Sequence, residues 1–83
     1  MGELRVLFFA TARQAAGCSE AAVPCEPDGI AESVLWGRLL TNFPALAPLR
    51  DSVRLARNCE YLKAGERFFP RDEAALIPPV SGG

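Results

Sequence analysis

The residues with the clearest capacity for chemistry form the last stretch of the printed sequence, where a proline pair leads into two glycines. Glycine has no Cβ, so such an end can enter a narrow channel and present the carboxylate of Gly83. A carboxylate is a poor electrophile until a phosphate or nucleotide is attached, and a thin, projecting end suits that activation. The prolines favour an extended course. The candidate tail residues are Pro78, Pro79, Val80, Ser81, Gly82 and Gly83.

The alternative for this tail is a frayed end or a cloning remnant, because terminal residues are commonly disordered. The other reactive groups are three cysteines, Cys18, Cys25 and Cys59, in a chain without histidine. They are odd in number, and no pair has the two-residue gap of a zinc or redox motif. We therefore expect buried or inert thiols, no disulfide framework and no metal site.

Composition limits the classes of partner. The net charge is −1 and no run of Lys or Arg occurs, so nucleic acid is not an expected partner. The length of 83 residues, with 49% hydrophobic residues, is typical of one soluble domain. No apolar run approaches the roughly 20 residues that span a membrane, and the run from Val6 to Ala10 is too short for an export signal. We expect a cytoplasmic protein without a membrane partner.

The apolar pattern near the start predicts a strand from Leu4 to Phe9. Alternate residues of a strand point to opposite faces, and here Leu7 and Phe9 make the second face apolar as well as the first. The strand is therefore expected in the middle of a sheet with both faces at least partly covered.

A short helical turn is expected next, because Thr11 and Gln14 have the spacing of a capping box and Gly17 supplies a left-handed stop. Residues 21–25 are then a weak second strand. Pro24 restricts this strand to a sheet edge or a strand end, because proline cannot donate to the ladder.

One long helix is predicted over residues 30–43, where apolar residues recur every three or four positions and Pro44 follows. We expect Trp36 and Leu39 to pack on the opening strand. Gly37 costs up to about 1 kcal/mol relative to Ala inside a helix, which suggests close approach to the sheet. The apolar stripe consists of Ile30, Val34, Leu35 and Leu39, with Trp36, Leu40 and Phe43 on the adjoining arc.

The second half of the chain predicts several short elements. These are a loop at 44–49 anchored by Leu46 and Leu49, extended pieces near 53–55, 58–62 and 68–69, turns at 63–66 and 70–73, and a strand at 74–77. The whole order predicts an α+β fold of the β-grasp type, with a mixed sheet of four to five strands on one main helix. The domain is expected to span 1–77, and 78–83 to form a protruding tail.

Several segments also match a known pattern. They are Leu4 to Ala10 with Arg13 and Gly17, Leu35 to Leu39 before Pro44-Ala45-Leu46, Asn58 to Tyr61, Asp72-Glu73, and Ala75 to Gly83. Nearly end to end, the chain resembles the small sulfur-carrier subunits of molybdopterin synthase, a ubiquitin-like β-grasp family. The most specific part is Ile77-Pro78-Pro79-Val80-Ser81-Gly82-Gly83. Two departures are Arg71, where the family has glycine, and Ala74-Ala75, where a branched residue is typical.

The resemblance implies a function for the tail. An E1-like adenylyltransferase would use ATP to convert Gly83 into an acyl-adenylate, and a sulfurtransferase donor would then replace the adenylate to leave a thiocarboxylate, a 1-thioglycine. The sulfur would pass to a cyclic pyranopterin precursor in the large subunit and form the molybdopterin dithiolene. The chain would thus be a non-catalytic sulfur-donor subunit of a heterotetramer, without a permanently bound cofactor.

Other functions remain open for the same tail. Sulfur carriers that serve thiamine synthesis or tRNA thiolation share the fold and the Gly-Gly end. A ubiquitin-type modifier would instead form isopeptide bonds with lysines of target proteins, and a plain interaction module would not use the tail.

A partner surface is expected beside the tail. One helix covers one face of the sheet, whereas Leu7, Phe9 and Ile77 put apolar groups on the other face, and such patches usually mark an interface. The alternative is that loops 44–49 and 62–70 fold over this face.

Overall fold

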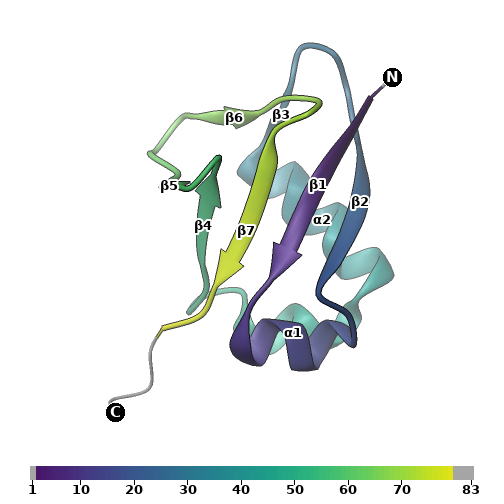
Figure 1. The fold of residues 1–83 in the computed structure, drawn as a ribbon, viewed down its shortest axis with the longest axis vertical. Coiled ribbons are helices and arrows are strands. Elements are labelled where there is room, and N and C mark those ends of the chain that lie inside the picture. Colours follow the sequence, from purple (N-terminus) through teal and green to yellow (C-terminus); the bar gives the residue numbers. More distant parts are fainter. Residues whose placement is uncertain (1, 80–83) are drawn as a thin grey trace.

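The structure, a computed structural model, describes residues 2–79. A sheet lies in front of a long helix in the view of Figure 1, with a shorter helix at one end. Along the chain the elements are β1 (Gly2–Phe8), α1 (Ala10–Ala16), β2 (Glu20–Cys25), β3 (Ile30–Ala31), α2 (Glu32–Asn42), the 3-10 helix η1 (Pro44–Leu49), β4 (Arg54–Arg57), β5 (Glu60–Tyr61), β6 (Arg67–Phe68) and β7 (Glu73–Ile77).

The main sheet has five strands in the order β2-β1-β7-β4-β5. Strands β1 and β7 are parallel, and the other neighbours are antiparallel. Strands β3 and β6 form a separate two-stranded sheet. A mixed sheet packed on one main helix confirms the predicted α+β, β-grasp fold. Strand β1 lies between two others, as expected, and β2 lies at the edge, where Pro24 is tolerated.

The core lies between the sheet and α2. Val6 and Phe8 of β1 belong to the same buried cluster as Trp36 and Leu39 of α2, so the predicted helix face lies in the common core. Phe43 extends the cluster, because its ring meets the ring of Phe8 edge to face at 5.3 Å between centroids. The strand therefore uses its alternate residues to hold the helix.

The capping box predicted at Thr11 is wrong. Helix α1 begins at Ala10, with Phe9 as its N-cap and without a side-chain cap. Pairing of β1 with β7 continues to Phe8, so the chain turns at once, and Ala10 adopts a positive φ of 49°. Thr11 consequently lies inside the first turn. The left-handed stop at Gly17 is confirmed by its φ of 78°.

Helix α2 begins at Glu32, two residues later than predicted, because Ile30 and Ala31 pair with β6. It ends at Asn42, one residue before the predicted end at Phe43, and Pro44 follows as expected. Val34 was expected in the apolar stripe, but it is 40% exposed.

Gly37 does not approach the sheet. The residue is exposed, and a Cβ built on it would meet no atom within 4 Å. The predicted close approach is therefore wrong, and this glycine is not required by packing.

The segment predicted as a loop at 44–49 is η1, and it is anchored in the core by Leu46. The predicted turn at 63–66 is closed by a 3.0 Å hydrogen bond from the Glu66 amide to the Lys63 carbonyl. The final strand begins at Glu73, one residue earlier than predicted, and ends at Ile77 as predicted.

Candidate functional site

The tail leaves from the middle of the sheet. Strand β7 lies between β1 and β4, and Ile77 at its end is paired with Arg54, the first residue of β4. Figure 1 shows that the chain leaves the sheet at the same end of the molecule as α1. Pro78 is still buried, whereas Pro79 is exposed. The predicted site residues Val80, Ser81, Gly82 and Gly83 lie outside the described residues, so their role and the boundary at residue 77 stay predictions.

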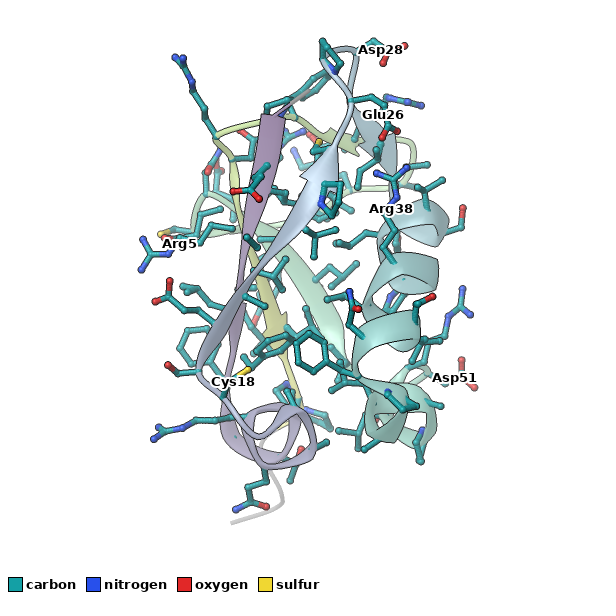
Figure 2. All side chains as sticks on the ribbon, turned by 90° about the vertical axis from the view of Figure 1, so that its right-hand side faces the viewer. Arg5, Cys18, Glu26, Asp28, Arg38 and Asp51 are labelled. Atoms are coloured by element: carbon teal, nitrogen blue, oxygen red, sulfur yellow. The ribbon has the colours of Figure 1, made fainter. Side chains whose placement is uncertain are left out.

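The sheet face opposite α2, here called the open face, carries a row of apolar residues beside the tail. Strand register places Leu7 next to Ala75, Ala75 next to Ala56, and Ala56 next to Tyr61, across four strands. Because successive side chains of a strand point to opposite faces, the residues just before and after these in each strand face the core. Arg5 projects on the side away from α2 in Figure 2, which identifies this face.

A hollow of about 340 Å³ forms in this row. It has a floor of two small residues, Ala56 and Ala75, between larger side chains. Its full lining is Leu7, Phe9, Ala56, Cys59, Tyr61, Glu73, Ala75 and Ile77. The structure therefore brings together the three residues predicted as a partner surface, Leu7, Phe9 and Ile77.

The loops that were the alternative cover do not contribute to this lining within residues 2–79. Leu46 of the 44–49 segment and Phe68 of the 62–70 segment are buried in the core cluster instead. On the open face, Phe9 is 47% exposed and Tyr61 is 51% exposed. The hollow is thus an accessible apolar surface continuous with the base of the tail.

Sequence reasoning missed Cys59 and Tyr61 as members of this surface. Asn58 and Cys59 form a two-residue turn between β4 and β5, with φ values of 51° and 72°. Positive φ at both positions is typical of the type I′ hairpin turn, for which Asn at the first position is a sequence signal. Recognising this turn would have placed Tyr61 opposite Ala56.

The three thiols differ in environment. Cys25 is buried, its Sγ lies 3.5 Å from the Phe68 carbonyl oxygen, and burial raises the pKa of its thiol, so it is inert as expected. Cys18 is partly buried and packs against the core. Cys59 is exposed in the turn between β4 and β5, so it is not one of the buried thiols.

Charged residues flank the hollow on two sides. On one side Arg5 contacts Glu20 at 3.0 Å and Glu73 at 3.5 Å, and the hydrogen bond to Glu20 raises the pKa of Arg5. On the tail side, the Arg54 guanidinium carbon lies 3.9 Å from the centre of the Tyr61 ring. The hollow therefore has two carboxylates and one guanidinium at its Arg5 end and a guanidinium at its tail end.

Within residues 2–79 no three His, Cys, Asp or Glu side chains lie close enough to hold a metal ion. A larger hollow of about 590 Å³ lies at the start of α2, but it shares no residue with the open face, and its charged residues have both signs. The arrangement at the tail is suited to binding another protein surface. In this described part, no helix has the length and apolar character needed to cross a membrane.

Comparison with known proteins gives consistent matches. The ThiS family model matches residues 6–83. The molybdopterin synthase sulfur carrier subunit of Arabidopsis thaliana is 38% identical over 81 residues, covering 98% of this chain and 83% of that protein. The subunit of the same name from Homo sapiens is 33% identical over 84 residues, covering 98% and 94%.

Solved structures agree in fold. SAMP1 from Haloferax volcanii superposes with a TM-score of 0.84 at 29% identity, covering 99% of this chain and all of that one. A chain from the complex of subunits 1 and 2 of the molybdopterin-converting factor from Helicobacter pylori superposes with a TM-score of 0.68 at 18% identity, covering 98% and 99%, and shows the same fold.

Proposed function

The chain belongs to the ThiS family, and from this premise we propose that it is the sulfur carrier subunit of a molybdopterin synthase. The observation that carries the proposal is the similarity to curated carrier subunits over 98% of the chain. The family match continues through residue 83, so the Gly-Gly end belongs to the matched region.

The proposed reaction uses the carboxylate of Gly83 as a carrier. An E1-like adenylyltransferase joins this carboxylate to the AMP part of ATP and releases pyrophosphate. A persulfide of the sulfur donor then attacks the acyl carbon, and AMP leaves. A second thiol of the donor cleaves the S–S bond of the resulting acyl disulfide, which releases the thiocarboxylate and leaves the donor as a disulfide. The thiocarboxylate sulfur is a soft nucleophile that needs no general base from this chain. After transfer to the cyclic pyranopterin precursor and hydrolysis, Gly83 is a carboxylate again.

The described residues support delivery of this tail to a partner. Two consecutive prolines at the base reduce the number of tail conformations, which lowers the entropy lost when the tail enters a channel. The hollow lies directly beside Ile77, so a large subunit that covers Leu7 and Phe9 would receive the tail at the edge of the same interface. Apolar patches of this kind are typical of protein–protein contacts.

A deletion tests the assignment. Removal of Gly82 and Gly83 is expected to leave the melting temperature nearly unchanged, because both residues follow the last strand, and to abolish molybdopterin formation in a reconstituted system. The full chain is the control. Normal molybdopterin synthesis by the shortened chain would contradict the proposal.

A protein modifier is the second candidate, because the match at a TM-score of 0.84 is to SAMP1, and a further match is named a small archaeal modifier protein. Mass spectrometry of protein from the native host separates the two functions. Replacement of one terminal oxygen by sulfur indicates a carrier, whereas attachment of Gly83 to lysines of other proteins indicates a modifier.

A further inference from the structure

Arg54 occupies a special place on the open face. It is the first residue of β4, it is exposed, and it is paired with Ile77, the last strand residue before the tail. Arg54 therefore lies beside Ile77, which lines the hollow and directly precedes the base of the tail. A partner that covers both the hollow and the base of the tail would therefore lie close to this guanidinium group.

Strand register explains why Arg54 is held there. Ala56 is paired with Tyr61, and Arg54 lies two residues before Ala56 on the same face, so Arg54 and Tyr61 are diagonal neighbours. The guanidinium carbon is 3.9 Å from the ring centre. This is a cation–π contact, and no hydrogen bond within residues 2–79 uses the N–H groups of this guanidinium, so they are available to donate to a partner.

The charge of Arg54 is not neutralised by the described residues, since its side chain has no ion pair or hydrogen bond within residues 2–79. Arg5 on the same face differs, because Glu20 and Glu73 both contact it. Glu60 is paired with Arg57 and so belongs to the other face. Asp51 projects on the α2 side in Figure 2, away from Arg5.

We propose that Arg54, oriented by Tyr61, is a specificity-determining residue that pairs with an acidic side chain of the large subunit, next to an apolar side chain seated in the hollow. The charge pattern supports this occupant. The Arg5 side of the hollow carries two carboxylates for one guanidinium, and the Arg54 side carries an unmatched cation, so the surface favours a partner of complementary polarity in one orientation. The net charge of the chain is −1, so this cation is a local feature.

This inference rests on the proposed function for the identity of the partner. The experiment is titration calorimetry of the full chain against the large subunit of molybdopterin synthase from the same host, at low and high salt. Arg54→Glu is expected to weaken binding at least about tenfold, and Arg54→Gln is expected to reduce the salt dependence of the affinity, because a charge pair is lost. Arg54→Lys should lie between these variants and the unaltered chain, since lysine keeps the charge but not the planar stacking.

Arg71→Glu is the matched control. It makes the same change in charge in the turn before β7, at the opposite end of that strand from Ile77. It is expected to leave the affinity within about twofold of the unaltered chain, as is usual for a charge outside the interface. Melting curves of each free variant confirm that the fold is kept.

The outcomes separate this inference from the proposed function. Binding of the unaltered chain with equal weakening by Arg54→Glu and Arg71→Glu, or with no weakening by Arg54→Glu, would overturn the role of Arg54 and leave the carrier function standing. Failure of the unaltered chain to bind the large subunit would overturn both.

Discussion

The two faces of the five-stranded sheet are built from alternate residues of the same strands, yet they differ in character. On the face toward α2, Leu4, Val6 and Leu76 are completely buried. On the open face, Leu7 and Ile77 are partly buried, and small alanines separate the larger side chains. The difference indicates that the face toward α2 contributes most of the stability of the fold, whereas the open face remains available for binding.

The strongest test of this difference replaces one leucine in the core, Leu39 of α2, and one leucine on the open face, Leu7 of β1. Leu39→Ala removes a completely buried side chain from the core and is expected to lower the free energy of unfolding by about 2–5 kcal/mol. Leu7→Ala on the open face is expected to cost less than about 1.5 kcal/mol, because less of its area leaves water on folding. Urea denaturation measures both. Equal losses would show that both faces contribute alike to stability.

A charge introduced into the hollow tests whether the open face is used for binding. Ala75→Glu is expected to weaken binding of the large subunit at least about tenfold, because docking would bury a carboxylate without a partner. The free energy of unfolding should change by less than about 1 kcal/mol, since the side chain can reach water in the free chain.

Ala22→Glu is the control for that variant. Ala22 is exposed on β2 and does not line the hollow. An equal effect of the two substitutions on binding would contradict docking at the hollow.

The outer surface of α2 offers a milder test. Gly37→Ala is expected to raise the free energy of unfolding by about 0.5–1 kcal/mol, because alanine loses less conformational freedom in a helix and a Cβ fits here without contact. Binding of the large subunit should not change. A loss of binding would place part of the interface on the helix side.

The hairpin turn beside the hollow carries strain. Cys59 has a φ of 72°, which costs a residue with a Cβ about 1–2 kcal/mol, whereas glycine adopts this value freely. Cys59→Gly is expected to raise the free energy of unfolding by about 0.5 kcal/mol, after subtraction of the larger entropy of glycine in the unfolded chain. Cys59→Ser keeps the strain and should show no gain. Thermal melts compare the two variants.

The smallest expected effect concerns an ion pair on the α2 side. The hydrogen bond from Arg38 lowers the pKa of Glu26 below its ordinary value of 4.5, so the charged form is favoured in the folded state. The stabilisation is therefore present above the unfolded pKa and is lost as the pH falls through the lower, folded pKa. Glu26→Gln should be less stable than the unaltered chain at neutral pH, and the difference should vanish in acid. A difference that persists at low pH would point to packing instead.

The local pattern of the sequence was sufficient to predict the elements that hold the site. The alternation in Leu4 to Phe9 and the period of residues 35–39 predicted the buried faces of β1 and α2, and Pro44 predicted the end of the helix. Leu7, Phe9 and Ile77 were predicted to share the open face. These predictions succeed because alternation and helical period are properties of neighbouring residues.

The failures have a different origin. Ile30 was assigned to the helix, but it pairs with Phe68, a contact that neighbouring residues do not indicate. Thr11 was predicted as a cap, but the pairing of β1 with β7 ends at Phe8, and the helix begins directly afterwards at Ala10. The residues near Thr11 do not indicate where this pairing ends. Cys59 was not predicted as part of the open face because its turn was not recognised. In the first two cases a partner distant in the sequence overrode the local preference.

The sequence by itself thus determined which residues are apolar on each face, where the helix ends, and that a thin Gly-Gly end follows a proline pair. Only the tertiary structure decided which strands are neighbours and in what register. Register places Ala75 beside Ala56, which creates the hollow, and Tyr61 diagonal to Arg54, which orients the guanidinium group beside the tail. The physical reason is that strand pairing joins residues far apart in the chain, so its geometry depends on the packing of the whole domain.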